Sequence, residues 1–203
     1  MSFGKIKTAL RGIINRKDLT DELAGDFITR AVREVERVVR IGPMEQLLEA
    51  SGFDGERHTV PIPSNYLELV DMFTQDGTLR QVTKDQLFAH RNEGRPAVFC
   101  KIGASWIVKP YPAASETVFV QFYGETLPLQ TDTDENVWTR AGFNAVLYQA
   151  AALAADYFQM EDVYVQRFQG KATSLVDAIL SQDLSEKWAG PLEIGDPINR
   201  GKF

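Results

Sequence analysis

Apolar stripes at both ends of the chain constrain its fold more than any other feature of the sequence. Near the N-terminus, apolar residues recur every three or four positions over 3–14 and again over 23–38. The same spacing returns over 138–155 and 164–179. This period is typical of an α-helix with one apolar face, and such a face must be buried against another element. The two pairs of helices are therefore expected to pack together into one bundle.

Local signals support these helices. Thr20 precedes Asp21 and Glu22, which is the pattern of an N-cap followed by acidic first-turn residues. Asn136 or a neighbouring acidic residue is expected to cap the third helix. Seven alanines lie in 141–155 of that helix, so it is expected to be central, with Ala145 and Ala152 facing other helices.

Strand patterns dominate the middle of the chain. The prolines of 58–63 indicate an edge strand, and Asp76-Gly77 predicts a hairpin between strands at 66–74 and 79–82. A second hairpin is expected over 97–109, and 117–123 alternates as a strand does. Thr83 is expected to cap a short helix, and residues 44–57 to form a short helical turn and a loop.

The predicted fold is α+β and mainly α. It consists of a helical bundle from the N- and C-terminal helix pairs (1–57 and 132–187), an inserted small antiparallel β-rich lobe (58–131) and an extended C-terminal tail (188–203).

The composition excludes several classes of protein. One cysteine, Cys100, rules out a disulfide framework within the chain, and two histidines leave little for a zinc site. The longest apolar runs are a few residues, far short of a membrane span. The N-terminal charges are scattered among apolar residues, unlike those of a signal peptide, so folding in a cytosol is expected.

No sequence motif for catalysis is evident. The chain contains no Gly-rich phosphate loop, HExxH, paired cysteines or Gly-x-Ser-x-Gly. Asp132-x-Asp134-Glu135 lacks the glycine and the distal glutamate of a calcium loop. We therefore predict no catalytic residue, no cofactor and no metal. The open alternative is a small hydrolase that uses a carboxylate pair from Glu68, Asp71 and Asp76.

Charge is unequally distributed along the chain. The net charge is −6, yet residues 1–19 hold five basic groups against Asp18 alone, whereas 132–203 hold six basic and eleven acidic groups. One interpretation is two solvated faces. The other is that Lys5, Lys7 and Arg11 of one subunit meet the acidic last third of another.

The last sixteen residues combine large apolar side chains with five Gly and Pro residues. They are predicted to dock on a groove or sheet edge of a partner through five apolar side chains, with packing against the chain's own bundle as the alternative. The docking residues are Trp188, Leu192, Ile194, Ile198 and Phe203.

The order of landmarks resembles a known family. In chain order they are Pro63-x-x-Tyr66-Leu67-x-Leu69, Asp76-Gly77, Gly94-Arg95-Pro96, Trp106, Pro110-x-Pro112, Phe122-Tyr123, Asn136-x-Trp138 and Leu147-Tyr148. Over about 1–182 the chain resembles the head–tail adaptor, or connector, proteins of tailed bacteriophages, the group that includes podovirus tail tubular protein A.

The resemblance implies a structural protein without catalytic residues. It implies a ring, expected to be dodecameric, beneath the portal protein, with a downstream tail or nozzle protein and self-contacts within the ring. Genomic DNA would pass through the channel without sequence-specific binding, and no membrane is involved. The bundles would form the ring wall, the lobe would point outward or toward the tail, and the C-terminal segment would reach the portal. The protein would be found in the virion at the head–tail interface, after assembly in the host cytoplasm. The alternative is a cytosolic bacterial protein-binding or regulatory helical module.

Overall fold

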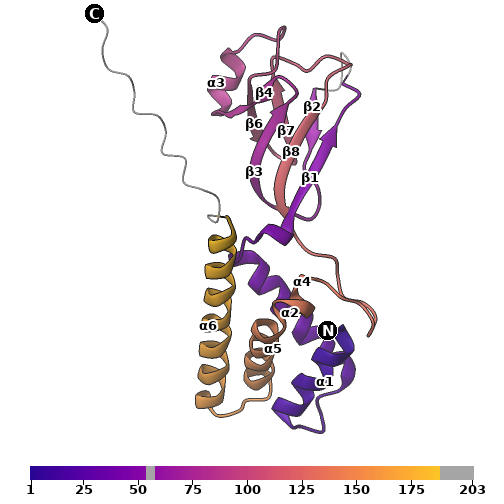
Figure 1. Cartoon of the computed structure of the whole chain (residues 1–203), viewed down its shortest axis with the longest axis vertical. Coiled ribbons are helices and arrows are strands. Elements are labelled where there is room, and N and C mark those ends of the chain that lie inside the picture. The colour runs from indigo at the N-terminus through magenta and orange to yellow at the C-terminus, as the bar shows by residue number, and fades with distance from the viewer. Residues whose placement is uncertain (54–57, 188–203) are drawn as a thin grey trace, which may run out of the picture.

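The computed structural model describes residues 1–53 and 58–187, and it places a helical bundle at one end and a strand-rich lobe at the other (Figure 1). The helices of the described residues are α1 (Phe3–Ile14), α2 (Asp21–Val38), α3 (Lys84–Ala89), α4 (Val137–Arg140), α5 (Phe143–Tyr157) and α6 (Asp162–Lys187), with a 3-10 turn at Gly42–Met44. The strands are β1 (Glu45–Ala50), β2 (Thr59–Pro61), β3 (Tyr66–Thr74), β4 (Gly77–Thr78), β5 (Arg80–Gln81), β6 (Val98–Ile102), β7 (Ser105–Lys109) and β8 (Val118–Gly124). The predicted α+β class, mainly α, is confirmed.

The bundle is built from helices at both ends of the chain. Helix α5 packs against α1, α2 and α6, and its alanines are buried among them, including Ala145 and Ala152 at 1% and 2% exposure. Small side chains let the neighbouring helix axes approach closely, which is why this helix can be central. The predicted central position of this helix is confirmed.

The three predicted N-caps, Thr20, Thr83 and Asn136, form. The Thr20 hydroxyl accepts a hydrogen bond from Leu23 N at 3.2 Å, and the Asn136 side chain accepts from the backbone of Trp138 and Thr139. The helix expected over 136–155 is, however, divided into α4 and α5 at Gly142. A Cβ atom at Gly142 would lie 2.5 Å from the buried Trp138 ring, so the close packing of that ring requires a glycine there.

The lobe consists of two four-stranded sheets, with strand orders β1-β8-β3-β4 and β2-β7-β6-β5. Its core lies between them and contains Met72, Phe99, Trp106, Val120 and Phe122. Strand β2, which carries Pro61, is at an edge as predicted, since proline cannot donate to a central ladder.

Two predictions within the lobe are wrong. Residues 45–50, expected as turn and loop, form strand β1, which pairs antiparallel with β8 across more than 60 residues. The strand expected to return over 79–82 is cut short. After β4, the chain crosses to the other sheet, where β5 runs parallel to β6.

The lobe joins the bundle through the segment around Gly42 and through residues 125–136, which we call the strap (Figure 1). The division of the chain at residues 57, 131 and 187 stays a prediction, although β1 favours a first boundary nearer Gly42. The predicted docking residues Trp188, Leu192, Ile194, Ile198 and Phe203 lie outside the described residues.

Candidate subunit and partner interface

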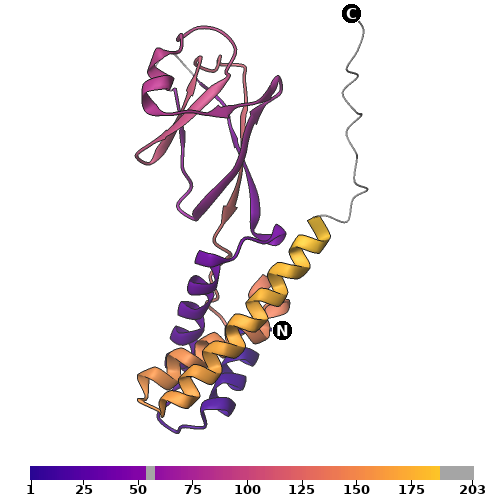
Figure 2. The ribbon, with the colours of Figure 1, turned by 90° about the vertical axis from the view of Figure 1, so that its left-hand side faces the viewer.

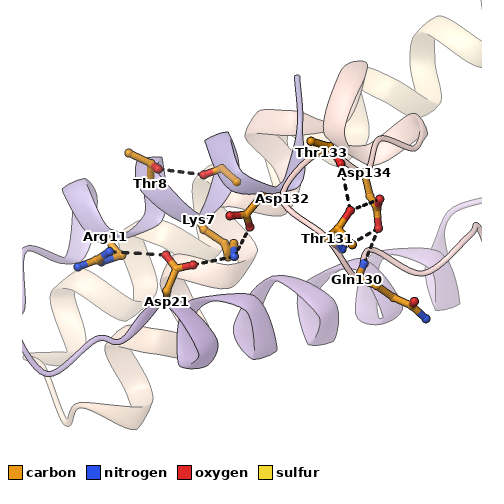
Figure 3. Close-up of polar contacts among 10 residues, drawn as sticks. Lys7, Thr8, Arg11, Asp21, Gln130, Thr131, Asp132, Thr133 and Asp134 are labelled. Atoms are coloured by element: carbon orange, nitrogen blue, oxygen red, sulfur yellow. Dashed lines mark hydrogen bonds and ion pairs between the residues drawn. The ribbon is translucent and has the colours of Figure 1, made fainter.

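Helix α1 carries Lys5, Lys7 and Arg11, which the sequence indicates for subunit contact, and Figure 3 shows how Lys7 and Arg11 lie. Lys7 Nζ donates to Asp21 Oδ2 of α2 at 2.7 Å and also pairs with Asp132 of the strap. Arg11 approaches the other oxygen of Asp21 at 3.6 Å. Hydrogen bonds to Asp132 and Asp21 raise the pKa of Lys7, and the bond from Lys7 lowers the pKa of Asp21. Lys7 therefore ties α1 to α2 and to the strap.

The strap is folded around a second carboxylate. Asp134 Oδ2 accepts from the backbone N–H groups of Gln130 and Thr131 at 2.7 and 2.8 Å, and the Thr131 hydroxyl donates to Oδ1. These hydrogen bonds lower the pKa of Asp134. The strap backbone in turn accepts from Phe3 N at 2.9 Å and Gly4 N at 3.0 Å, so the start of α1 is held along it.

The three predicted contact residues thus differ in their availability. The Lys7 side chain is 11% exposed and engaged within the chain, whereas that of Arg11 is 51% exposed and Lys5 is exposed. Lys5 and Arg11 can reach a neighbouring molecule. The internal role of Lys7 was missed because its partners lie 14 and 125 residues away along the sequence.

Helix α6 lies on the side of the bundle opposite α1 (Figures 1 and 2). One face of α6 packs on α5 through Phe168 and Ala172, as the sequence predicts, but Tyr164 of the same predicted stripe is 41% exposed. Between α6 and α2 lies a groove of about 380 Å³, where Val38 is 71% exposed and Asp177 lies at the rim. This side of the bundle offers apolar and acidic groups to a neighbour.

A buried carboxylate joins the bundle to the strap. Glu36 of α2 is 2% exposed, and its Oε1 accepts from Trp138 Nε1 at 2.7 Å and from the N and Oγ1 of Thr126 at 3.0 and 2.6 Å. A cavity of about 260 Å³ lies beside it, between α2 and the strap. No local pattern marks Glu36, since Trp138 is 102 residues away.

The end of α6 lies at the base of the lobe. Asp183 Oδ1 accepts a hydrogen bond from Gly42 N at 2.7 Å, three residues before β1 begins. The last turn of α6 therefore lies beside the junction of bundle and lobe.

The carboxylates considered for a hydrolase have other partners. Glu68 accepts from Arg40 Nε at 2.9 Å, Asp71 accepts from Met72 N at 2.7 Å, and Asp76 lies 3.7 Å from Arg95. Among residues 1–53 and 58–187, no group of three potential metal ligands comes together. In the same part of the chain, no helix is long and apolar enough to cross a membrane.

A comparison with protein families identifies the chain. The model of the SU10 adaptor protein family matches residues 1–195, so the chain belongs to this family. No curated protein matches the sequence. The resemblance to phage head–tail adaptors is confirmed at the level of the family, and the chain is a structural adaptor protein and a virion component.

Proposed function

We propose that this chain forms a dodecameric ring beneath the portal and joins the DNA-filled head to the tail, as a head–tail adaptor without catalytic activity. The match of the SU10 adaptor family to residues 1–195 carries this proposal. A portal protein on one side and a tail or nozzle protein on the other are the partners that such a role requires. The protein would assemble in the host cytoplasm and remain at the head–tail interface of the virion.

The ring would be closed by contacts between unlike surfaces. Helix α1 exposes Lys5 and Arg11 on one side of the bundle, and α6 presents the acidic, apolar groove with Asp177 on the other. A heterologous contact of this kind joins one surface to a different one on the next subunit and generates a ring when the rotation closes. The opposed positions of α1 and α6 support this arrangement.

DNA would pass the ring without sequence-specific binding. Residues 132–203 carry six basic and eleven acidic groups, so the last third of the chain repels the phosphate backbone. We propose that this acidic part contributes to the channel wall and that DNA slides past it.

The C-terminal residues would dock on the portal. Trp188, Leu192, Ile194, Ile198 and Phe203 supply apolar area that a groove or sheet edge of the portal could bury. They follow the end of α6, where Asp183 contacts Gly42 at the base of the lobe.

The test is reconstitution of the purified chain with a purified portal, followed by mass measurement and class averaging of negatively stained particles. The expected result is a twelvefold ring on the portal, which adds about 270 kDa for chains of 22.8 kDa. A chain that remains monomeric with the portal would refute the proposal and favour the cytosolic binding module.

Charge reversal tests the subunit contact. Replacing Lys5 and Arg11 together with Glu should weaken ring formation, because both charges would then repel the acidic side of the neighbour. The matched control is Arg167→Glu, which adds a negative charge to exposed α6 and should not weaken the ring. Equal effects of both variants would contradict the assignment of α1 and α6 to this contact.

A further inference from the structure

The outer face of the β1-β8-β3-β4 sheet carries apolar side chains that the core of the lobe does not use. Leu47 is 54% and Val70 is 42% exposed, the latter where a bulge interrupts the pairing of β3. Phe73 and Phe119 stack on each other at a centroid distance of 5.3 Å and belong to none of the core clusters of the described residues. These four residues form what we call the sheet patch.

Acidic side chains surround the sheet patch. Strands β1, β3 and β8 contain four carboxylates and no Lys, Arg or His. Glu49 stands directly opposite Phe119, and Asp71 is opposite Gln121 on the same face. Glu45 and Glu68 lie nearer the bundle. An apolar centre with a charged rim is typical of a protein interface, and its acidic rim selects a partner with cations.

Helix α3 presents the complementary chemistry. Phe88 is 55% exposed, Lys84 lies one turn before it, and Arg80 and Arg91 are also exposed. Asp85 is the one acidic residue of 80–91. A capping box between Thr83 and Gln86 and the fully buried Leu87 hold the helix in place. This short helix therefore displays an aromatic side chain among cations on a fixed support.

The two surfaces face in opposite directions. Leu87 packs with Val98 and Cys100 of β6, so α3 covers the outside of the other sheet of the lobe. In Figure 1, α3 lies on the side of the lobe away from β1. One copy can therefore offer α3 to one neighbour and the sheet patch to the other.

We propose that α3 of one copy docks on the sheet patch of the next copy, with Phe88 against Phe73 and Phe119 and with Lys84 and Arg91 facing Glu49 and Asp71. The occupant is a second copy of this chain because the chain itself supplies the matching charge and aromatic side chain. This lobe contact would act beside the α1–α6 contact of the bundles. The part of this inference that places the contact within a closed ring rests on the proposed function. The contact between α3 and the sheet patch can be tested in any self-associated form of the chain.

Disulfide cross-linking of the full chain tests the contact. Leu47→Cys combined with Phe88→Cys should give a ladder of multimers on oxidation, since each copy would link to two neighbours. Either single variant should give at most dimers, and the native Cys100 is buried. The matched control combines Leu47→Cys with Val163→Cys, which is equally exposed on α6, and should give no ladder.

The experiment is run on the chain alone at high concentration and on the chain mixed with portal. Rings without a ladder would overturn the lobe contact and leave the proposed function standing. A ladder without rings on the portal would support the contact and count against the proposed function. No association in either sample would overturn both, and linkage of Phe88→Cys to the portal would assign α3 to another partner.

A charge swap supplies an independent measurement. Lys84→Glu should weaken self-association about tenfold, and Glu49→Lys in the same chain should restore most of it. Both positions are exposed, so the variants should fold as the parent does, which circular dichroism checks. Failure of Glu49→Lys to restore association would overturn the pairing.

Discussion

Replacing Glu36 with alanine should strongly destabilise the junction between the bundle and the strap. Glu36 Oε1 accepts three hydrogen bonds, one from the buried Trp138 indole and two from Thr126. Alanine removes the acceptor and leaves the Trp138 N–H without a partner at a position that is 0% exposed.

The magnitude follows from the burial of each donor. Leaving the buried Trp138 N–H without its acceptor should lower the free energy of unfolding by about 2 kcal/mol. Loss of each of the two partly buried Thr126 hydrogen bonds should lower it by about 0.5 kcal/mol more. The free energy of unfolding should therefore fall by about 3 kcal/mol. For a protein of this length, that corresponds to a decrease in Tm of about 6–12 °C.

Thermal and urea unfolding, followed by circular dichroism and tryptophan fluorescence, measure this change. Glu36→Gln keeps an oxygen that can accept the same bonds, so its cost should be about 1 kcal/mol. Asp26→Ala, on the exposed face of α2, is the matched control and should stay within about 0.5 kcal/mol. If Glu36→Ala melts within 1 or 2 °C of the parent chain, the carboxylate does not hold the strap and the reasoning is wrong.

Three further predictions concern packing, the C-terminal residues and pH. Ala152 is 2% exposed, so Ala152→Leu should overpack the contacts of α5 and lower the free energy of unfolding by about 1–3 kcal/mol. An unchanged Tm would place α5 away from the centre of the bundle. A chain truncated after Lys187 should melt like the full chain yet fail to bind portal, and a large fall in Tm would assign those residues to the fold. The pKa of Asp134 is lowered in the fold, so its ionised carboxylate should stabilise the protein at pH values above 3.8, the ordinary pKa of the group. This stabilisation should be lost as the pH falls through the lower pKa that Asp134 has in the folded protein. Unfolding curves of Asp134→Asn should therefore differ from the parent at pH 7 and converge with it in strong acid, and a constant difference would contradict the assignment.

The elements that the sequence predicts correctly are those with local causes. Thr20 and Asn136 cap helices within three residues of themselves, and the alanines of α5 mark a closely packed helix. Strand β1 could not be predicted in this way, because its partner β8 lies at residues 118–124 and its own pattern, Glu-Gln-Leu-Leu-Glu-Ala, does not alternate clearly.

The sequence predicts part of the candidate interface, as it does part of the fold. The excess of basic residues in α1 is a property of composition, and the structure leaves Lys5 and Arg11 exposed. Lys7 contacts Asp21 and Asp132 only because of how α1, α2 and the strap pack together. The same holds for the hydrogen bond between Glu36 and Trp138. Contacts of this kind follow from tertiary packing and have no signature in residue spacing.

The position of the end of α6 bears on how the subunit is oriented in a ring. The 26 residues of α6 rise by about 39 Å from the far end of the bundle to the base of the lobe, where Asp183 meets Gly42. The sixteen residues after Lys187 can span at most about 55 Å. A path back along the bundle would use most of that reach, whereas a path past the lobe leaves all of it for a partner. If these residues bind the portal, we therefore expect the lobe to point outward or toward the portal, because a lobe directed at the tail would force the chain to turn back along α6.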